Sequence, residues 1–396
     1  MQFPRLIVVS VLGSTQTLAW ASSYYLPAIL ADDMAAACGV SRAWVFGAFS
    51  ASLLLAAVLG PAVGRQIDRT GGARILVISN IVFAVGLAAV GLSGGPIGLA
   101  LSWAVLGVGM ALGLYDVAFA TLARLYGRDA RGAITGITLL AGFASTIGWP
   151  LSAFMDAHIG WRGACFVWAA LHVGIGLPLN FFFIPSPQTV LERPRAERAS
   201  WEPHKEMFLM AYVFAAAWFV TGAMAAHLPA LLETMGASPT QAIAAAALVG
   251  PAQVAARLAE FLAIRRAHPL MSARIAACLH PIGALFLGLV GSPAASSFAL
   301  LHGAGNGLLT IARGTVPLAI FGPEGYGART GLLGAPARAT QAIAPFLFGM
   351  LLDAMGGWTL AVSSGLSLSA FFALLILRTP PRRAETLRST ISECGH

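Results

Sequence analysis

Four ionisable residues lie inside apolar stretches that are long enough to cross a membrane as helices. Asp116, Arg257, Arg313 and Arg338 each stand about eight to ten positions from the end of such a stretch. A helix rises about 1.5 Å per residue, so each side chain is expected roughly 12–15 Å deep in a hydrocarbon core about 30 Å thick. A charge at that depth is costly and normally faces a cavity, a charged partner or a substrate.

Three arginines and one carboxylate predict an electropositive interior. A guanidinium group binds a carboxylate through two hydrogen bonds and keeps its proton at physiological pH, so the set is suited to a small anion. The alternative is a structural ion-pair network, for example between Asp116 and Arg313. One carboxylate cannot neutralise three guanidinium groups, so at least one positive charge is expected to remain for a ligand. Further candidates for polar contact with a ligand are Tyr24, Tyr25, Gln253, Asn306 and Gln341.

The composition is that of an integral membrane protein. Of 396 residues, 58% are hydrophobic and 10% are charged, against about 25% charged residues in soluble chains, and the mean hydropathy is +0.78. Each apolar stretch of about 20 residues can span a bilayer as a helix. The prediction is an all-α membrane protein with about twelve transmembrane helices at 4–31, 42–66, 74–93, 97–126, 131–155, 160–184, 207–233, 239–265, 270–290, 295–321, 327–352 and 358–377.

The net charge of +8 is concentrated in alternate loops. The loops between them carry mostly Asp and Glu, which is the positive-inside asymmetry of a multi-pass protein. We therefore expect a bacterial-type inner membrane location with both termini cytoplasmic, a lipid bilayer rather than nucleic acid as the charged partner, and a monomer. The basic residues of these loops are Arg65, Arg69, Arg74, Arg124, Arg128, Arg131, Arg193, Arg195, Arg198, Lys205, Arg265, Arg266 and Arg274.

Two halves repeat short motifs in the same order. Gly60-Pro61-Ala62 matches Gly250-Pro251-Ala252, and Thr135-Gly136 matches Thr330-Gly331. Such a repeat is typical of two pseudo-symmetric bundles related by an axis along the membrane normal. The predicted organisation is an N-terminal six-helix bundle at 1–185, a cytoplasmic linker at 186–205, a C-terminal six-helix bundle at 206–378 and a cytoplasmic tail at 379–396.

Neither a cofactor nor a metal is expected. The four cysteines, Cys38, Cys165, Cys278 and Cys394, are scattered without ligand-like spacing. The sequence contains no nucleophile–base pair or metal cluster that would indicate a membrane enzyme. A receptor or regulator is not expected either, because it would need a signalling domain or a long loop.

The loop after the second predicted helix carries an unusual density of polar residues. It reads Gly64-Arg65-Gln66-Ile67-Asp68-Arg69-Thr70-Gly71-Gly72-Ala73-Arg74 and resembles the signature loop between the second and third helices of major facilitator superfamily transporters. The resemblance implies that Gly64, Asp68, Arg69, Gly71 and Arg74 form a gate. Asp68 is then expected to meet the N-terminal end of the eleventh helix near Gly327, with Arg69 and Arg74 steadying it.

Within that superfamily the chain resembles the monocarboxylate transporter and oxalate–formate exchanger branch. Tyr24-Tyr25-Leu26-Pro27-Ala28 is similar to the first-helix element of that branch, and Gln253-Val254-Ala255-Ala256-Arg257 to its eighth-helix Asp-x-x-x-Arg element. The resemblance implies a carrier that moves a small organic anion by alternating access, with Arg257 binding the substrate carboxylate. Two departures matter: Ala28 replaces the lysine and Gln253 the aspartate of the proton-coupling pair.

Coupling must then use another group or anion exchange. A desolvated carboxylate has a raised pKa and can hold a proton at neutral pH, which favours Asp116. Glu260 and His302 are further candidates, together with His227 and His280, although a single histidine in an apolar helix is more often a packing residue. The alternative function is a drug or metabolite efflux proton antiporter, which would favour acidic rather than basic residues in the cavity.

Overall fold

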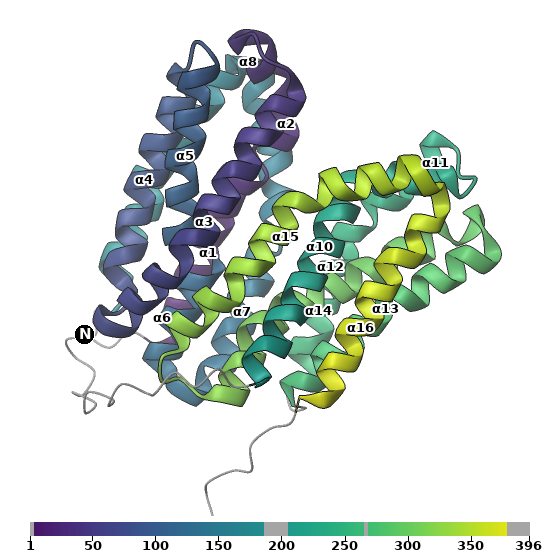
Figure 1. Ribbon diagram of the computed structural model, residues 1–396. Coiled ribbons are helices and arrows are strands. Elements are labelled where there is room, and N and C mark those ends of the chain that lie inside the picture. Colours follow the sequence, from purple (N-terminus) through teal and green to yellow (C-terminus); the bar gives the residue numbers. More distant parts are fainter. Residues whose placement is uncertain (1–3, 186–204, 265–267, 378–396) are drawn as a thin grey trace, which may run out of the picture.

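The helices predicted from hydropathy are present. The structure is a computed structural model that describes residues 4–185, 205–264 and 268–377, and these contain helices and no strands. The described residues form the twelve spans of the predicted fold in two lobes, which we call the N lobe (4–185) and the C lobe (205–377) (Figure 1). The predicted linker, apart from Lys205, and the predicted tail lie outside the described residues.

Several spans of the N lobe are built from two helices. The first is α1 with the π-helical turn η1 and α2, the fourth is α5 with α6, and the fifth and sixth share α8, which is interrupted at Gly160 where φ is +72°. The helices are α1 (Arg5–Ala19), η1 (Trp20–Tyr24), α2 (Pro27–Cys38), α3 (Arg42–Thr70), α4 (Ala73–Leu92), α5 (Pro96–Gly113), α6 (Tyr115–Tyr126), α7 (Ala130–Ala141), α8 (Ala144–Leu171) and α9 (Leu177–Phe183).

The C lobe repeats this plan with longer single helices. The eighth span of the chain, which is the second of the C lobe, consists of α11, α12 and the π-helical segment η5. The helices are α10 (Lys205–Thr234), α11 (Pro239–Ala247), α12 (Val249–Ala259), η5 (Glu260–Ile264), α13 (Pro269–Val290), α14 (Ala295–Phe321), α15 (Tyr326–Met355) and α16 (Thr359–Ile376).

The first span is longer than predicted. It was expected to end at residue 31, but α2 continues to Cys38 and stops at Gly39, which adopts a left-handed conformation. Asp32 and Asp33 are exposed and therefore cost little in a helix that has already left the apolar layer. Charged residues mark the edge of that layer rather than the end of the helix.

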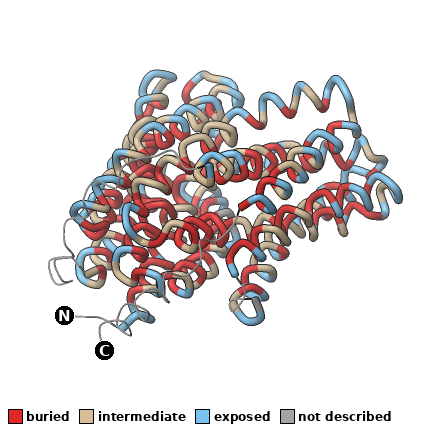
Figure 2. Tube along the Cα trace, turned by 60° about the horizontal axis from the view of Figure 1, so that its bottom comes forward, coloured by how far each residue is buried: buried red, intermediate tan, exposed pale blue. Residues whose placement is uncertain are grey.

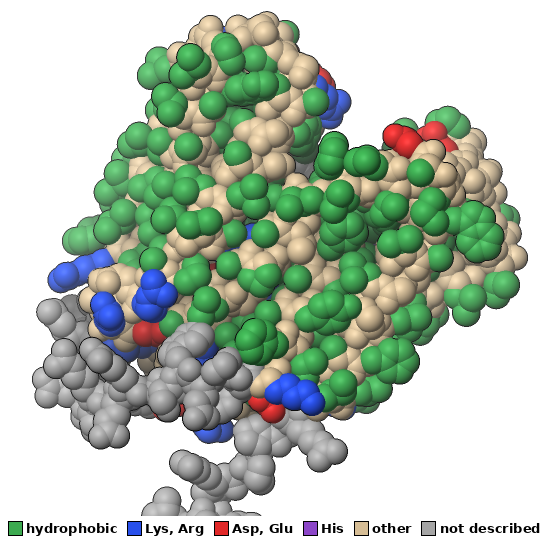
Figure 3. All heavy atoms as spheres, in the orientation of Figure 1, with side chains coloured by type: hydrophobic (Ala, Val, Ile, Leu, Met, Phe, Trp, Pro, Cys, Tyr) green, Lys and Arg blue, Asp and Glu red, His purple; other side chains and the backbone are tan. Residues whose placement is uncertain are grey.

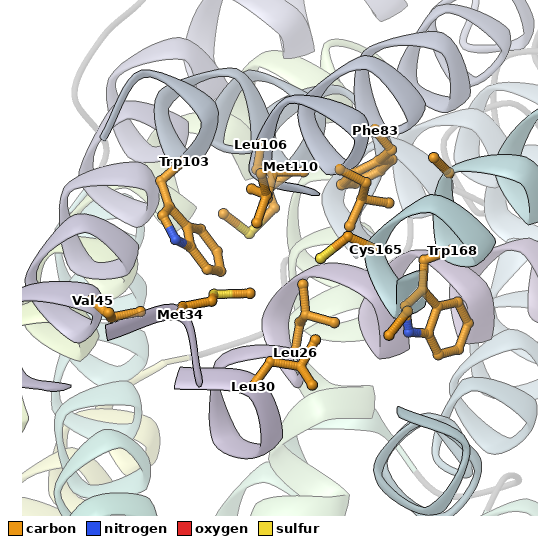
Figure 4. Close-up of a cluster of buried hydrophobic side chains, with 14 of the residues drawn as sticks. Leu26, Leu30, Met34, Val45, Phe83, Trp103, Leu106, Met110, Cys165 and Trp168 are labelled. Carbon is orange, nitrogen blue, oxygen red and sulfur yellow. The ribbon is translucent and has the colours of Figure 1, made fainter. Parts of the chain in front are cut away.

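Apolar side chains cover the sides of the molecule, as expected for a surface that faces lipid. Figure 3 shows hydrophobic side chains spread over both lobes, with Lys and Arg side chains gathered at the lower end. Buried residues follow the inner faces of the helices (Figure 2). One buried cluster of the N lobe brings α2, α3, α4, α5 and α8 together through Leu26, Leu30, Met34, Val45, Phe83, Trp103, Leu106, Met110, Cys165 and Trp168 (Figure 4).

The two lobes meet at one end and separate at the other. In Figure 1 they converge at the lower end, and Figure 3 shows a notch between them at the upper end. The most extensive contact across the lobes joins α3 and α15. A Cβ atom at Gly64 would lie 1.9 Å from the carbonyl oxygen of Gly327, so α15 could not approach α3 as closely with any other residue there.

Candidate functional site

Asp116 lies at a helix start in the middle of the fourth span. Leu114 has an extended backbone that separates α5 from α6, and Asp116 falls in the first turn of α6. A carboxylate is favoured there because the first amide groups of a helix present partial positive charge. The interruption of the helix at Leu114 therefore positions a buried negative charge in the middle of the span.

Asp116 binds two arginines of the C lobe through a single oxygen. The Nη2 atom of Arg313 donates to Asp116 Oδ2 at 2.7 Å, and Nη2 of Arg338 donates to the same oxygen. Arg338 also donates from Nη1 to the carbonyl oxygen of Ala56 on α3 at 3.1 Å, and the Arg313 guanidinium lies 4.9 Å from the ring of Trp218. The structural ion pair offered as an alternative is present, and Arg338 extends it to a triad that joins the two lobes.

Arg257 has a different environment. It is 5% exposed, and its guanidinium donates to the carbonyl oxygen of Thr138 at 3.3 Å, to Gln253 Oε1 at 3.4 Å and to Thr310 Oγ1 at 3.3 Å. These contacts are longer than the usual 2.7–2.9 Å of charge-assisted hydrogen bonds, and Arg257 Nε has no partner within the described residues. No carboxylate of the described chain lies within ion-pair distance of this guanidinium.

Four aromatic rings of the N lobe, those of Trp20, Tyr24, Tyr25 and Tyr115, contact one another and form a cluster that we call the aromatic wall. Trp20 lies 5.0 Å from Tyr24 and 4.9 Å from Tyr115, and Tyr24 lies 5.4 Å from Tyr25, measured between ring centroids. Pro27 has no backbone N–H, so the helix loosens just before it into the π-helical turn that holds Trp20 and Tyr24.

Gln341 connects this wall to the C lobe. Its Nε2 atom donates to the hydroxyl oxygen of Tyr24 at 2.6 Å, between α15 and the first span. Two residues from the sequence prediction, Tyr24 and Gln341, are thus in direct contact. Asn306 lies elsewhere: it accepts a hydrogen bond from Thr221 at 3.1 Å and lines a pocket inside the C lobe with His280 and His302.

The candidate proton carriers have separate surroundings. Glu260 is 1% exposed and forms an ion pair with Arg131 at 3.0 Å across the lobes. His302 Nδ1 lies 3.0 Å from Nδ1 of His280, whose Nε2 lies 3.0 Å from the hydroxyl of Ser363. His227 Nε2 lies 2.7 Å from the carbonyl oxygen of Pro345. Both buried histidines of the C lobe are therefore held in a hydrogen-bonded chain.

The last turn of α3 contacts the start of α15; the helix was expected to end at residue 66 but continues to Thr70, so most of the predicted polar loop is helical. Asp68 accepts hydrogen bonds from the backbone N–H groups of Gly327 and Ala328, both at 2.8 Å. Gly71 ends α3 with a φ of +81°, a conformation that favours glycine. The steadying contacts differ from the expectation: Arg124 donates to the Asp68 carbonyl oxygen at 2.7 Å, whereas Arg69 and Arg74 are exposed. Arg69, in the last turn of α3, and Arg74, in the first turn of α4, lie on exposed faces of their helices.

Sequence reasoning missed several groups that complete these sites. The partners of Arg257 and Arg338 include the backbone carbonyls of Thr138 and Ala56, and a backbone contact leaves no trace in residue type. No motif indicated Trp218, whose ring lies against the Arg313 guanidinium. Thr310 follows Asn306 by four residues on α14, and that spacing was the available signal for a polar helix face.

Comparisons with known proteins agree with this architecture. The sequence model of the Major Facilitator Superfamily matches residues 12–301. Among the solved structures that are similar is the crystal structure of the human organic anion transporter MFSD10 (TETRAN), with a TM-score of 0.74 and 17% sequence identity. The similarity covers 94% of this chain and 100% of that one. No curated protein sequence matches the chain.

Proposed function

The chain belongs to the major facilitator superfamily and is a membrane transporter, and we propose that it moves a small organic anion of the carboxylate type by alternating access. The observation that carries the proposal is the environment of Arg257. A buried guanidinium with only neutral partners leaves a full positive charge in the interior, and such a charge is stabilised when a carboxylate arrives. The long contacts of Arg257 are easily exchanged for shorter ones to a bound anion.

The surroundings of Arg257 favour binding between the lobes. Thr138 belongs to the N lobe, and Gln253 and Thr310 belong to the C lobe. An anion that draws the guanidinium away from Thr138 changes the contact between α7 and α12. Substrate binding is in this way linked to the movement of the lobes, as alternating access requires.

The basic end of the molecule is, in this proposal, cytoplasmic. The positive-inside rule assigns it to the cytoplasm, and the notch at the other end then opens to the outside. Asp68 bound to the start of α15 and Glu260 bound to Arg131 keep the cytoplasmic end closed. The similarity to a human organic anion transporter supports an anionic substrate only by analogy of fold.

A thermal-shift screen of the purified protein tests the proposal. The probes are lactate, oxalate and benzoate, inorganic phosphate and sulfate, and tetraphenylphosphonium as a lipophilic cation. At least one carboxylate should raise the apparent Tm of the wild-type protein in a concentration-dependent way, because a ligand stabilises the state that it binds. The Arg257→Gln variant should lose this response, whereas Arg128→Gln, at an exposed position, should keep it. Stabilisation by the cation alone would contradict the proposal.

A further inference from the structure

We propose that Glu260 binds the coupling proton, and that its protonation opens the closed end of the transporter by breaking its ion pair with Arg131. The proposal rests on the transport function proposed above and adds the coupling ion and its site. Glu260 belongs to η5 in the C lobe and Arg131 to the first turn of α7 in the N lobe, so the pair joins the two lobes. Arg131 follows Arg124 by seven residues, and Arg124 contacts Asp68, which binds the start of α15, so the pair lies toward the end where α3 and α15 meet.

The two oxygens of the Glu260 carboxylate have different surroundings. Oε1 accepts from Arg131 Nη2 at 3.0 Å, while Oε2 is fully buried and has no hydrogen-bond partner within the described residues. A buried carboxylate oxygen without a partner is destabilising, and a proton placed on it removes the charge that causes this cost. Once protonated, Glu260 no longer attracts Arg131 as an ion.

Asp116 is poorly suited to the same role. Both of its guanidinium partners act on Oδ2, so a proton there would leave two positive charges buried without a counter-charge. Protonation of Glu260 leaves one guanidinium, that of Arg131, which retains access to water at 22% exposure. The two buried carboxylates of the interior therefore differ in what happens to their partners after neutralisation.

Few other ionisable groups of the described residues face Glu260. Among the elements packed against α12 and η5, α7 supplies Arg131, α14 supplies Arg313 and His302, and α11 has no ionisable residue. Arg313 is bound to Asp116 and His302 to His280. His268, just before α13, interacts with Arg131, and its pKa is held below the usual range first by burial and then by Arg131 and Arg274.

Glu260 lies one helical turn from the proposed anion site. Arg257 and Glu260 are three residues apart, and their partners on α7, Thr138 and Arg131, are seven residues apart, or about two turns. An anion at Arg257 adds negative charge beside Glu260 and makes proton uptake more favourable. By linkage, a proton on Glu260 strengthens anion binding by the same factor. The arrangement predicts symport of one proton with the anion.

The experiment measures closure directly and needs no substrate. Spin labels are attached through Gln66→Cys on α3 and Glu324→Cys before α15, two exposed positions at the converging end, in a background without the four native cysteines. Distances between the labels are recorded by pulsed electron paramagnetic resonance from about pH 8 to about pH 4, a range that reaches the ordinary titration of a glutamate. The wild-type background should show short separations at high pH and a growing population of long separations as the pH falls.

Glu260→Gln should show long separations already at high pH and lose the pH response. The ratio of long to short separations should rise about tenfold or more relative to the wild type, which corresponds to about 1.4 kcal/mol. Glu260→Asp, which retains a titratable group, should keep a pH response. His268→Gln and Arg128→Gln are controls that should behave as the wild type. Should Glu260→Gln fail to fold, Arg131→Gln is measured in its place and should likewise be open at high pH.

Two results would overturn the proposal. The first is a wild-type background whose label separation does not respond to pH. The second is a Glu260→Gln variant, or its substitute Arg131→Gln, that is closed at high pH and responds to pH as the wild type does. These outcomes are separate from failure of the transport proposal. A protein that responds to pH through Glu260 but is stabilised by no carboxylate would lack the anion site. A protein stabilised by a carboxylate through Arg257 but with a pH-independent separation would lack this proton site.

Discussion

The interior of this transporter holds two arginine sites with opposite character. Arg313 and Arg338 share the carboxylate of Asp116, and all three are buried at the contact between α6, α14 and α15. Arg257 is equally buried but contacts only hydroxyl, amide and backbone oxygens. Both sites contain buried arginines. They differ because a carboxylate of the protein, that of Asp116, lies beside Arg313 and Arg338 but not beside Arg257.

This difference suggests a division of labour. A guanidinium whose charge is already balanced stabilises an arrangement of helices, and here it joins the N lobe to the C lobe. A guanidinium whose charge is unbalanced is stabilised further by an anion from outside. In the function proposed above, the triad serves closure and Arg257 serves recognition of the substrate.

The largest expected effect comes from removing the acid of the triad. Asp116→Asn would leave Arg313 and Arg338 buried without a counter-charge, which typically destabilises a protein by about 3–5 kcal/mol. The apparent Tm in detergent, or the chemical denaturation midpoint, should fall well below the wild-type value. A variant as stable as the wild type would show that the triad does not hold the lobes together.

A smaller effect is expected from separating α3 and α15. Gly64→Ala would place a Cβ atom 1.9 Å from the Gly327 carbonyl oxygen, and overpacking of this kind costs about 1–3 kcal/mol. The label pair Gln66→Cys and Glu324→Cys should report longer separations at high pH. Gly47→Ala is the matched control on the same helix, because nothing lies within 4 Å of its added Cβ atom. Equal behaviour of the two variants would contradict close approach of the helices.

Tyr24→Phe measures how much the hydrogen bond between Tyr24 and Gln341 contributes to the contact between the lobes. It removes the hydroxyl that accepts from Gln341 and should cost about 1 kcal/mol of the contact between the lobes. The measurable result is a modest shift of the same label distances toward long separations, with the pH response retained. A shift as large as that of Gly64→Ala would mean that this hydrogen bond, rather than the helix contact, controls closure.

Arg257→Gln should have the smallest effect on stability. Its hydrogen bonds are long and its charge is uncompensated, so loss of the bonds and relief of the buried charge nearly cancel, within about 1 kcal/mol. The apparent Tm without ligand should stay near the wild-type value. A loss comparable to that of Asp116→Asn would place Arg257 in the structural network and remove the distinction between the two sites.

Much of the fold follows from the sequence, because a membrane span needs a long apolar stretch and leaves a clear record of it. Residue depth along those stretches also singled out the four interior charges. Which charges pair could not be deduced, because pairing depends on how α6, α14 and α15 face one another. The break at Leu114, which puts Asp116 at a helix start, has no strong sequence signal, since neither proline nor glycine occupies that position.

The contacts of the predicted gate residue Asp68 were also only partly predictable from the sequence. A family resemblance connected Asp68 with Gly327, and those residues are in contact. The resemblance did not identify Arg124, which comes from a different span and approaches the loop through the fold. Contacts between neighbours in sequence are more readily predicted than contacts between elements brought together by packing.

Exchange of a radiolabelled carboxylate in proteoliposomes measures whether Arg257 recognises the transported anion. The probe is the carboxylate that gives the largest thermal shift, and wild-type protein is compared with Arg257→Gln and with Arg128→Gln. The account predicts saturable exchange by the wild type and by Arg128→Gln, and loss of saturable exchange in folded Arg257→Gln. Exchange by Arg257→Gln at the wild-type rate and apparent affinity would contradict it.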